Sequence, residues 1–184
     1  CFTLSTTPVK MRIKMLCLSV IKFWFEEITP AQWWQKSDKL DALIRDRFSI
    51  LHQSATRCEL FEWRCSPRGR LAEIIILDQA TAFAHDSLAL ALAQQAIADG
   101  SDQRVGAKQR GFFYMPFMHS ESQKIQTQSV QLFSQPGLDT HLPSAQRHHA
   151  IIERFDRFPH RNKTLGRVST TEELAFLKQP GSSF

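Results

Sequence analysis

Helical periodicity is the feature of this sequence that most limits its fold. Between residues 38 and 56 the apolar side chains recur at spacings of three and four, which is the pattern of an amphipathic helix. No stretch alternates with period two over a useful length, so no sheet is expected. Periodicity, helix propensity and capping signals together predict helices at Asp38–Thr56, Pro67–Leu77, Ala82–Ala98, Ser120–Phe133 and Leu142–Arg157. Helices joined by short turns predict an all-α chain of antiparallel helical hairpins.

Local signals mark where several helices begin. Ser37-Asp38 and Ser66-Pro67 each place a capping residue before a helix, and Thr170 with Glu173 has the spacing of a capping box. The segment Ser120–Gln123 has the same spacing and predicts a second box. The apolar run Leu71–Leu77 is short enough for a strand, but basic residues before it and Asp78-Gln79 after it favour a buried helix.

Composition narrows the classes of partner. The 184 residues carry a formal charge of +5, but the cations are interspersed with acids, which does not favour nucleic-acid binding. The four cysteines are scattered without a C-x-x-C pair, so neither a zinc ribbon nor a redox motif is expected. Scattered cysteines in a chain of this size fit a reducing compartment, so we expect a cytoplasmic location. No apolar run reaches the roughly 18 residues of a membrane helix. Residues 1–15 are expected to be disordered or an extension, and residues 16–184 to form a single domain.

The stretch from Arg154 to Arg167 is the most unusual part of the chain. It places five cations, a histidine and an asparagine between aromatic rings. Guanidinium groups match carboxylates and phosphates, so Arg154, Arg157 and Arg161 could clamp an anion together with His160. The alternative is that they pair with internal carboxylates such as Asp78, Glu73 or Glu121. The residues alone leave both interpretations open.

A second polar group lies at a predicted helix start. His119 and Glu121 resemble half a metal site, but no i,i+4 histidine pair is present, so a hydrogen-bonded role is favoured and neither a metal nor a cofactor is expected. His148 shares a helix face with Ile151 and Ile152, which is typical of a core histidine. Buried guanidiniums must meet anions or carbonyls, so we expect these polar residues to converge in one partly buried cluster. The candidate ligand-binding residues are Asp78, Gln79, His119, Glu121, Arg154, Arg157, His160, Arg161 and Asn162.

Several motifs carry a resemblance to a known family. They are Phe23-Trp24-Phe25, Trp33-Trp34, Leu77-Asp78-Gln79, Tyr114 to Glu121, Arg154 to Asn162 and the closing Gly181-Ser182-Ser183-Phe184. With these motifs the chain resembles the bacterial domain of unknown function family 924, which is grouped with the tetratricopeptide-like (TPR-like) helical superfamily. The resemblance covers residues 18–184 and implies an all-helical, TPR-like fold. It implies no particular activity.

The chain departs from the family pattern at two places. After Leu-Asp-Gln the family continues with Phe-Pro-Arg-Asn and a basic, glycine-containing loop, whereas Gln79 is followed here directly by Ala80-Thr81-Ala82-Phe83. Either the loop is absent from the chain, or the printed sequence omits it. In the second case the Cα atoms of Gln79 and Ala80 will lie farther apart than the roughly 3.8 Å of a peptide. A mobile loop beside a polar site would suit a lid. Asp156 stands where the family usually has glycine.

Two hypotheses of function follow. In the first, the chain is a binding module with a conformationally gated polar site, and its partner is a small anionic ligand or a peptide. In the second, it is a hydrolase-like small-molecule enzyme that uses His119 with Glu121 and Arg157 with His160. Whether it is an enzyme is left open, and neither nucleic acid nor membrane is an expected partner.

Overall fold

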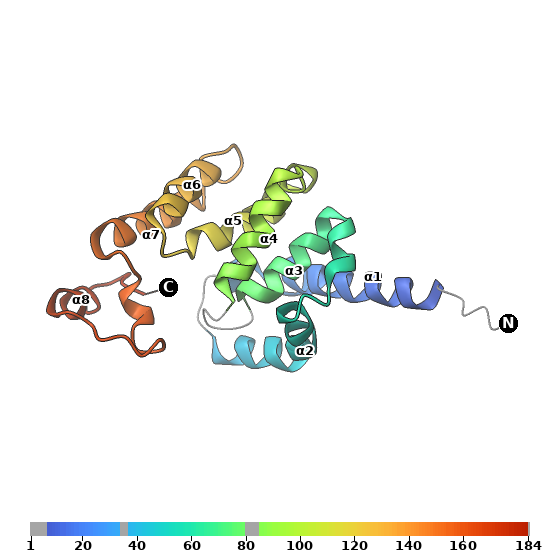
Figure 1. The fold of residues 1–184 in the computed structure, drawn as a ribbon, viewed down its shortest axis with the longest axis horizontal. Coiled ribbons are helices and arrows are strands. Elements are labelled where there is room, and N and C mark those ends of the chain that lie inside the picture. The colour runs from blue at the N-terminus through green and yellow to red at the C-terminus, as the bar shows by residue number, and fades with distance from the viewer. Residues whose placement is uncertain (1–6, 34–36, 80–84, 184) are drawn as a thin grey trace. The chain divides into compact units, whose positions relative to one another are not determined.

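The described part of the chain is helical throughout. The computed structural model describes residues 7–33, 37–79 and 85–183, and none of them forms a strand (Figure 1). The predicted all-α class is therefore confirmed. The contacts of the chain divide it into two compact units, Cys1–Pro116 and Phe117–Phe184. A single TPR-like domain over residues 16–184 stays a prediction.

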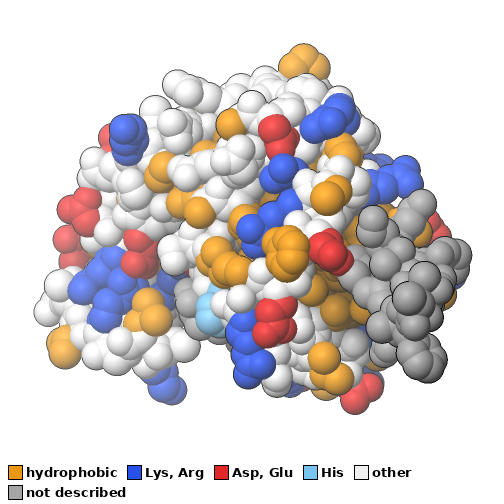
Figure 2. Space-filling view, turned by 45° about the vertical axis from the view of Figure 1, so that its right-hand side comes forward, with side chains coloured by type: hydrophobic (Ala, Val, Ile, Leu, Met, Phe, Trp, Pro, Cys, Tyr) orange, Lys and Arg blue, Asp and Glu red, His pale blue; other side chains and the backbone are white. Residues whose placement is uncertain are grey.

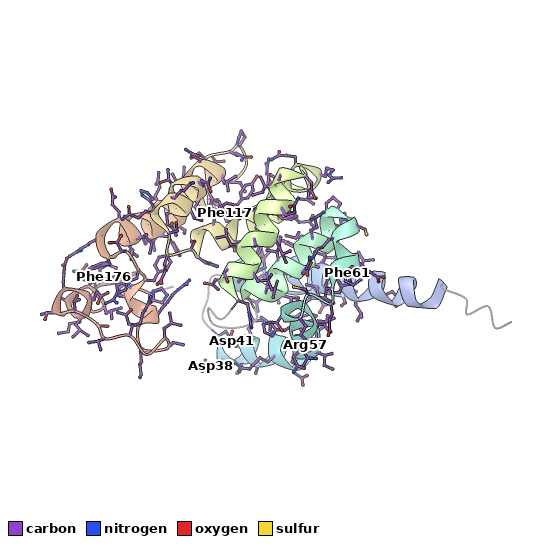
Figure 3. All side chains as sticks on the ribbon, in the orientation of Figure 1. Asp38, Asp41, Arg57, Phe61, Phe117 and Phe176 are labelled. Carbon is purple, nitrogen blue, oxygen red and sulfur yellow. The ribbon has the colours of Figure 1, made fainter. Side chains whose placement is uncertain are left out.

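The first unit holds most of the helices. In chain order they are α1 (Thr7–Lys22), η1 (Phe23–Glu27), η2 (Pro30–Trp33), α2 (Asp38–Thr56), η3 (Phe61–Cys65), α3 (Pro67–Gln79), α4 (Asp86–Ala98), η4 (Asp102–Arg104) and α5 (Ala107–Met118), whose last two residues belong to the second unit. Helix α1 begins at Thr7, so residues 7–15 of the segment 1–15 are helical. That this segment is an extension of the domain stays a prediction. The prediction for α2 is confirmed, and Figure 3 labels Asp38 and Asp41 in its first turn.

Helix α3 is the central helix of the first unit. Every residue from Leu71 to Asp78 is buried, because α3 packs against α1, α2 and α4. A helix that is apolar on all sides must be covered on all sides, which explains the unbroken apolar run. The structure thus confirms the helical interpretation of Leu71–Leu77 over the strand. Gly69 allows the close approach of η3, since a β-carbon there would overlap the Trp63 carbonyl oxygen.

Aromatic side chains fill a second part of the first unit. The Trp33 ring lies edge-on to the rings of Phe25 and Phe112, with centroids 5.7 and 5.1 Å away, and its Nε1 donates to the Trp24 carbonyl at 2.9 Å. Trp34 and residues 80–84 lie outside the described residues. Helix α4 begins at Asp86 with His85 at its N-cap, so the predicted start at Ala82 was wrong. The expected break at Gln79–Ala80 stays a prediction.

The second unit consists of a helix pair and a C-terminal segment. Helices α6 (Gln123–Phe133) and α7 (Leu142–Phe155) pack on each other, and η5 (Pro159–Arg161) and α8 (Thr171–Phe176) follow. Its core contains the buried Ile151, Ile152 and Phe158, with Phe155 and Phe176 packed against them; Figure 3 labels Phe176.

Apolar side chains also reach the surface in both units. Figure 2 shows them between charged side chains on one face of the molecule. Ile50 is 78% exposed and Val168 is 87% exposed. Single exposed apolar residues are common and do not by themselves mark an interface. No helix among the described residues has the length and apolar character that crossing a membrane requires.

Two predicted helices in the second unit differ from the structure at one end, by no more than the roughly two to four residues expected for boundaries read from a sequence. Helix α6 begins at Gln123 with Ser122 at the N-cap, and Ser120 accepts a hydrogen bond from the Ser122 amide at 3.3 Å, so Ser120–Gln123 is not a capping box. Helix α7 ends at Phe155 rather than Arg157, because Asp156 adopts the left-handed conformation with φ of 55°. The box of Thr170 with Glu173 is confirmed, with both reciprocal hydrogen bonds present.

The conformation of Asp156 predicts the effect of restoring glycine there. A left-handed residue with a β-carbon is strained, and glycine is the usual residue at this position after a helix. We expect Asp156→Gly to raise the free energy of unfolding by about 0.5–1 kcal/mol and Asp156→Ala to lower it by about 1 kcal/mol, measured by urea denaturation. A loss of stability in the glycine variant would mean that the hydrogen bond from Gln123 Nε2 to Asp156 Oδ1, 2.6 Å long, outweighs the strain.

Candidate functional site

Glu121 is bound by two segments of the second unit. Its Oε2 accepts from Arg167 Nη1 at 2.7 Å, and its Oε1 accepts from Arg167 Nη2 at 2.9 Å and from the Phe158 amide at 2.7 Å. Burial raises the pKa of this carboxyl, but the hydrogen bonds from Arg167 and Phe158 lower it more, so the net pKa lies below its usual value. Glu121 is therefore an ionised structural carboxylate at neutral pH.

Arg157 is bound by a carboxylate that the sequence did not suggest as its partner. Its Nε and Nη2 donate to the two carboxylate oxygens of Glu173 at 2.6 and 2.8 Å, and Nη2 also donates to the Val168 carbonyl. Glu173 Oε2 accepts from the Thr170 amide as well, at 2.6 Å. The hydrogen bond from Arg157 is the main reason why the pKa of Glu173 falls to about 2. The capping box of α8 thus also anchors the stretch that follows α7.

Two histidine rings and one guanidinium lie against Phe158, and a third histidine ring lies beside one of the two. We call His119, His148, His160 and Arg161 the histidine cluster. The ring centroids of His148 and His160 lie 5.5 and 5.8 Å from that of Phe158, and those of His119 and His148 are 6.2 Å apart. The Arg161 guanidinium carbon lies over the Phe158 ring, 4.7 Å from its centroid. Both His148, at 5% exposed, and Arg161, at 6%, are buried.

Two of these histidines are neutral at neutral pH. Burial, together with His119, His160 and Arg161, lowers the pKa of His148 to about 3, against a smaller opposite effect of its hydrogen bond to Ser144. Burial and Arg161 lower the pKa of His160 to about 4, although Glu121 opposes this. Because the Ser144 carbonyl, 2.7 Å from His148 Nδ1, can only accept, the proton of His148 lies on Nδ1.

Gln126 holds the turn that carries His119 and Glu121. Its side chain is fully buried, and Nε2 lies 2.7 Å from the Met118 carbonyl, 2.6 Å from that of Ser120 and 3.4 Å from that of Phe117. One amide therefore satisfies the carbonyls left open where α5 ends. Sequence reasoning missed this role, because the sequence shows only one more glutamine on an amphipathic helix.

The remaining candidate residues lie at other places. Asn162 is buried, at 1% exposed, and its Nδ2 donates to Ser169 Oγ at 3.0 Å. Arg154 donates to Glu172 at the surface, with distances of 2.9 and 2.8 Å. Asp78 and Gln79 belong to the first unit, where Gln79 Nε2 donates to Asp78 Oδ2 at 2.6 Å. Their convergence with the residues of the second unit stays a prediction.

No group of three or more histidine, cysteine, aspartate or glutamate side chains among the described residues is arranged to hold a metal ion. The functional groups of the histidine cluster in the second unit are therefore neutral imidazoles beside a buried guanidinium. A guanidinium donates hydrogen bonds to anions, and an imidazole whose Nδ1 proton is already held donates from Nε2 once it is protonated.

Comparison with known proteins identifies the family of the chain and a solved structure with a similar fold. Residues 20–181 match the model of the family described as bacterial protein of unknown function (DUF924). A solved structure of a protein of unknown function from Agrobacterium tumefaciens is 37% identical, with a TM-score of 0.84, over 90% of this chain and 98% of that one. The comparison with curated proteins gave no match.

Proposed function

This chain belongs to the DUF924 family of bacterial proteins of unknown function, and we propose that its second unit binds a small anion at the histidine cluster. The ligand chemistry is a carboxylate or a phosphate, free or carried by a peptide. The observation that supports this most is the buried Arg161, which lies over Phe158 beside imidazoles that are neutral. A guanidinium presents paired N–H donors to such anions, and His148, whose Nδ1 proton is held by the Ser144 carbonyl, can add a donor at Nε2 when it takes up a second proton.

The electrostatic surroundings of the cluster favour an anion. Burial, Arg161 and the neighbouring histidines lower the pKa of both His148 and His160, and the charge of Glu121 opposes this lowering at His160. A bound anion would reverse that effect and raise both pKa values, so binding takes up protons. The affinity is therefore expected to increase as the pH falls from neutral.

The proposal gives Arg157 and Arg167 a structural role. Each makes two hydrogen bonds to one carboxylate inside the second unit, Arg157 to Glu173 and Arg167 to Glu121. These pairs hold the segment on either side of Phe158 and His160. They position the histidine cluster and are not used as ligand groups.

Native mass spectrometry with and without denaturation would first detect a co-purified ligand. Calorimetric titration with inorganic phosphate and with acetate then tests the site directly. We expect Arg161→Gln to weaken binding at least about tenfold, because a charge-assisted pair is lost. The matched control is Lys163→Gln, which removes an exposed charge two residues away and should bind normally.

The pH dependence and a second variant complete this test. Binding should tighten between pH 7 and pH 5, and His160→Asn, which cannot take up the proton, should flatten that dependence. If Arg161→Gln does not fold, this second variant still tests the proposal. Equal binding by wild type and Arg161→Gln, or no binding of either anion, would contradict it.

A hydrolase-like enzyme is the second candidate. Neutral imidazole is the form that accepts a proton, and His148 and His160 both have it at neutral pH. Their pKa values of about 3 and about 4 lie far below the near-neutral value that suits a general base, so this candidate has less support. Ligand turnover that His160→Asn abolishes would favour the enzyme over the binding module.

A further inference from the structure

A shallow hollow of about 270 Å³ lies on the second unit, and none of its lining residues belongs to the histidine cluster. We infer that it is a second binding site, for a small aryl carboxylate. Its lining includes Arg147, Ala150, Ile151, Arg154, Phe155 and Phe176. A volume of this order suits a single ring with a short acidic arm, since drug-sized ligands occupy larger pockets.

One helix supplies a continuous stripe of this hollow. Arg147, Ile151 and Arg154 recur at spacings of four and three along α7, which places them on one face. Ala150 completes that face from the neighbouring turn. The stripe therefore begins and ends with a guanidinium, and between them lies the apolar surface of Ala150 and Ile151.

Two aromatic rings form the apolar side of the hollow. Phe155 and Phe176 pack with their centroids 5.0 Å apart. The Arg154 guanidinium carbon lies 4.8 Å from the Phe155 centroid and 6.0 Å from that of Phe176, while the same group donates to Glu172. Arg154 is thus fixed at one side of the hollow by these contacts. The two rings offer an apolar surface on which the ring of a ligand can stack.

Arg147 supplies the positive charge that would pair with the carboxylate of the ligand. It is exposed, and the ion pairs among the described residues do not include it. Its Nη1 lies beside Gly181, where a β-carbon would come within 3.7 Å of it, so its guanidinium is at the rim of the hollow. A ligand ring on Phe155 and Phe176 would place its carboxylate toward Arg147, and the charges match.

Phenylacetate is the probe for this site. In amide chemical shift titrations of the full chain, we expect saturable shifts at Phe155, Phe176 and Gly181. The neutral isostere phenylacetamide should bind about five- to tenfold more weakly, and Arg147→Gln should weaken phenylacetate binding by the same factor. Ala150→Leu fills the hollow from an exposed position and should also weaken it, without relying on charge.

Two controls separate this inference from the proposed function. Arg45→Gln removes an exposed charge in the first unit and should leave phenylacetate binding unchanged. Excess inorganic phosphate should not displace phenylacetate if the two sites are distinct. Absence of saturable shifts, equal binding of phenylacetamide, or an unaffected Arg147→Gln variant would overturn the second site, while phosphate binding at the histidine cluster could persist.

Discussion

Replacing Gln126 by glutamate is expected to lower the free energy of unfolding by about 3 kcal/mol at neutral pH. The side chain is fully buried, and its Nε2 faces the carbonyl oxygens of Phe117, Met118 and Ser120. A carboxylate of the same shape has no donor, so it loses all three contacts and adds a buried charge beside three oxygens. Urea denaturation measures the difference.

The same substitution at Gln128 is the matched control. Gln128 lies on the same helix but is exposed, so Gln128→Glu should change stability by less than about 0.5 kcal/mol. Acidification gives a second check, because the introduced carboxyl regains one O–H donor when it is protonated. The pKa of the introduced carboxyl is raised in the folded state, so the loss of unfolding free energy in Gln126→Glu should become smaller as the pH falls. A deficit like that of the control would show that this amide does not hold the turn.

Local signals in the sequence predicted where helices form better than they predicted which polar side chains contact each other. Thr170 and Glu173 are three residues apart, and their capping box could be read because both partners belong to one turn. The apparent box at Ser120 failed because Ser120 Oγ accepts from the Ser122 amide, while the side chain of Gln123 donates to Asp156, which is 33 residues away in the sequence. Local spacing cannot reveal a competitor at that distance.

The partners of the buried cations show the same limit. One of the two interpretations that the sequence left open was that the guanidiniums pair with internal carboxylates such as Asp78, Glu73 or Glu121. In the structure Glu73 binds Arg64, at 2.8 and 2.7 Å, and Arg157 binds Glu173. The need for a counter-charge follows from composition and burial, whereas its identity follows from tertiary packing.

Loss of the charge on Glu173 is the second large effect. Its side chain is 2% exposed and accepts hydrogen bonds from Arg157 and from the Thr170 amide. We expect Glu173→Gln to lower the free energy of unfolding by about 2–3 kcal/mol at neutral pH, because the ion pair and one half of the capping box are weakened together. The adjacent Glu172→Gln is the control: its pair with Arg154 is solvent-exposed and should matter by less than about 0.5 kcal/mol.

The pH dependence of unfolding identifies the charge on Glu173 as the cause. Its pKa is about 2 in the folded chain and 4.5 without the fold, so the unfolded state binds the proton first as the pH falls. The stabilisation is therefore complete above about pH 4.5 and is lost progressively toward pH 2. Wild type should lose this contribution on acidification, and Glu173→Gln, which has no carboxyl to protonate, should not. Parallel pH profiles for the two proteins, or equal destabilisation by Glu172→Gln, would show that the pair of Arg157 with Glu173 does not stabilise the second unit.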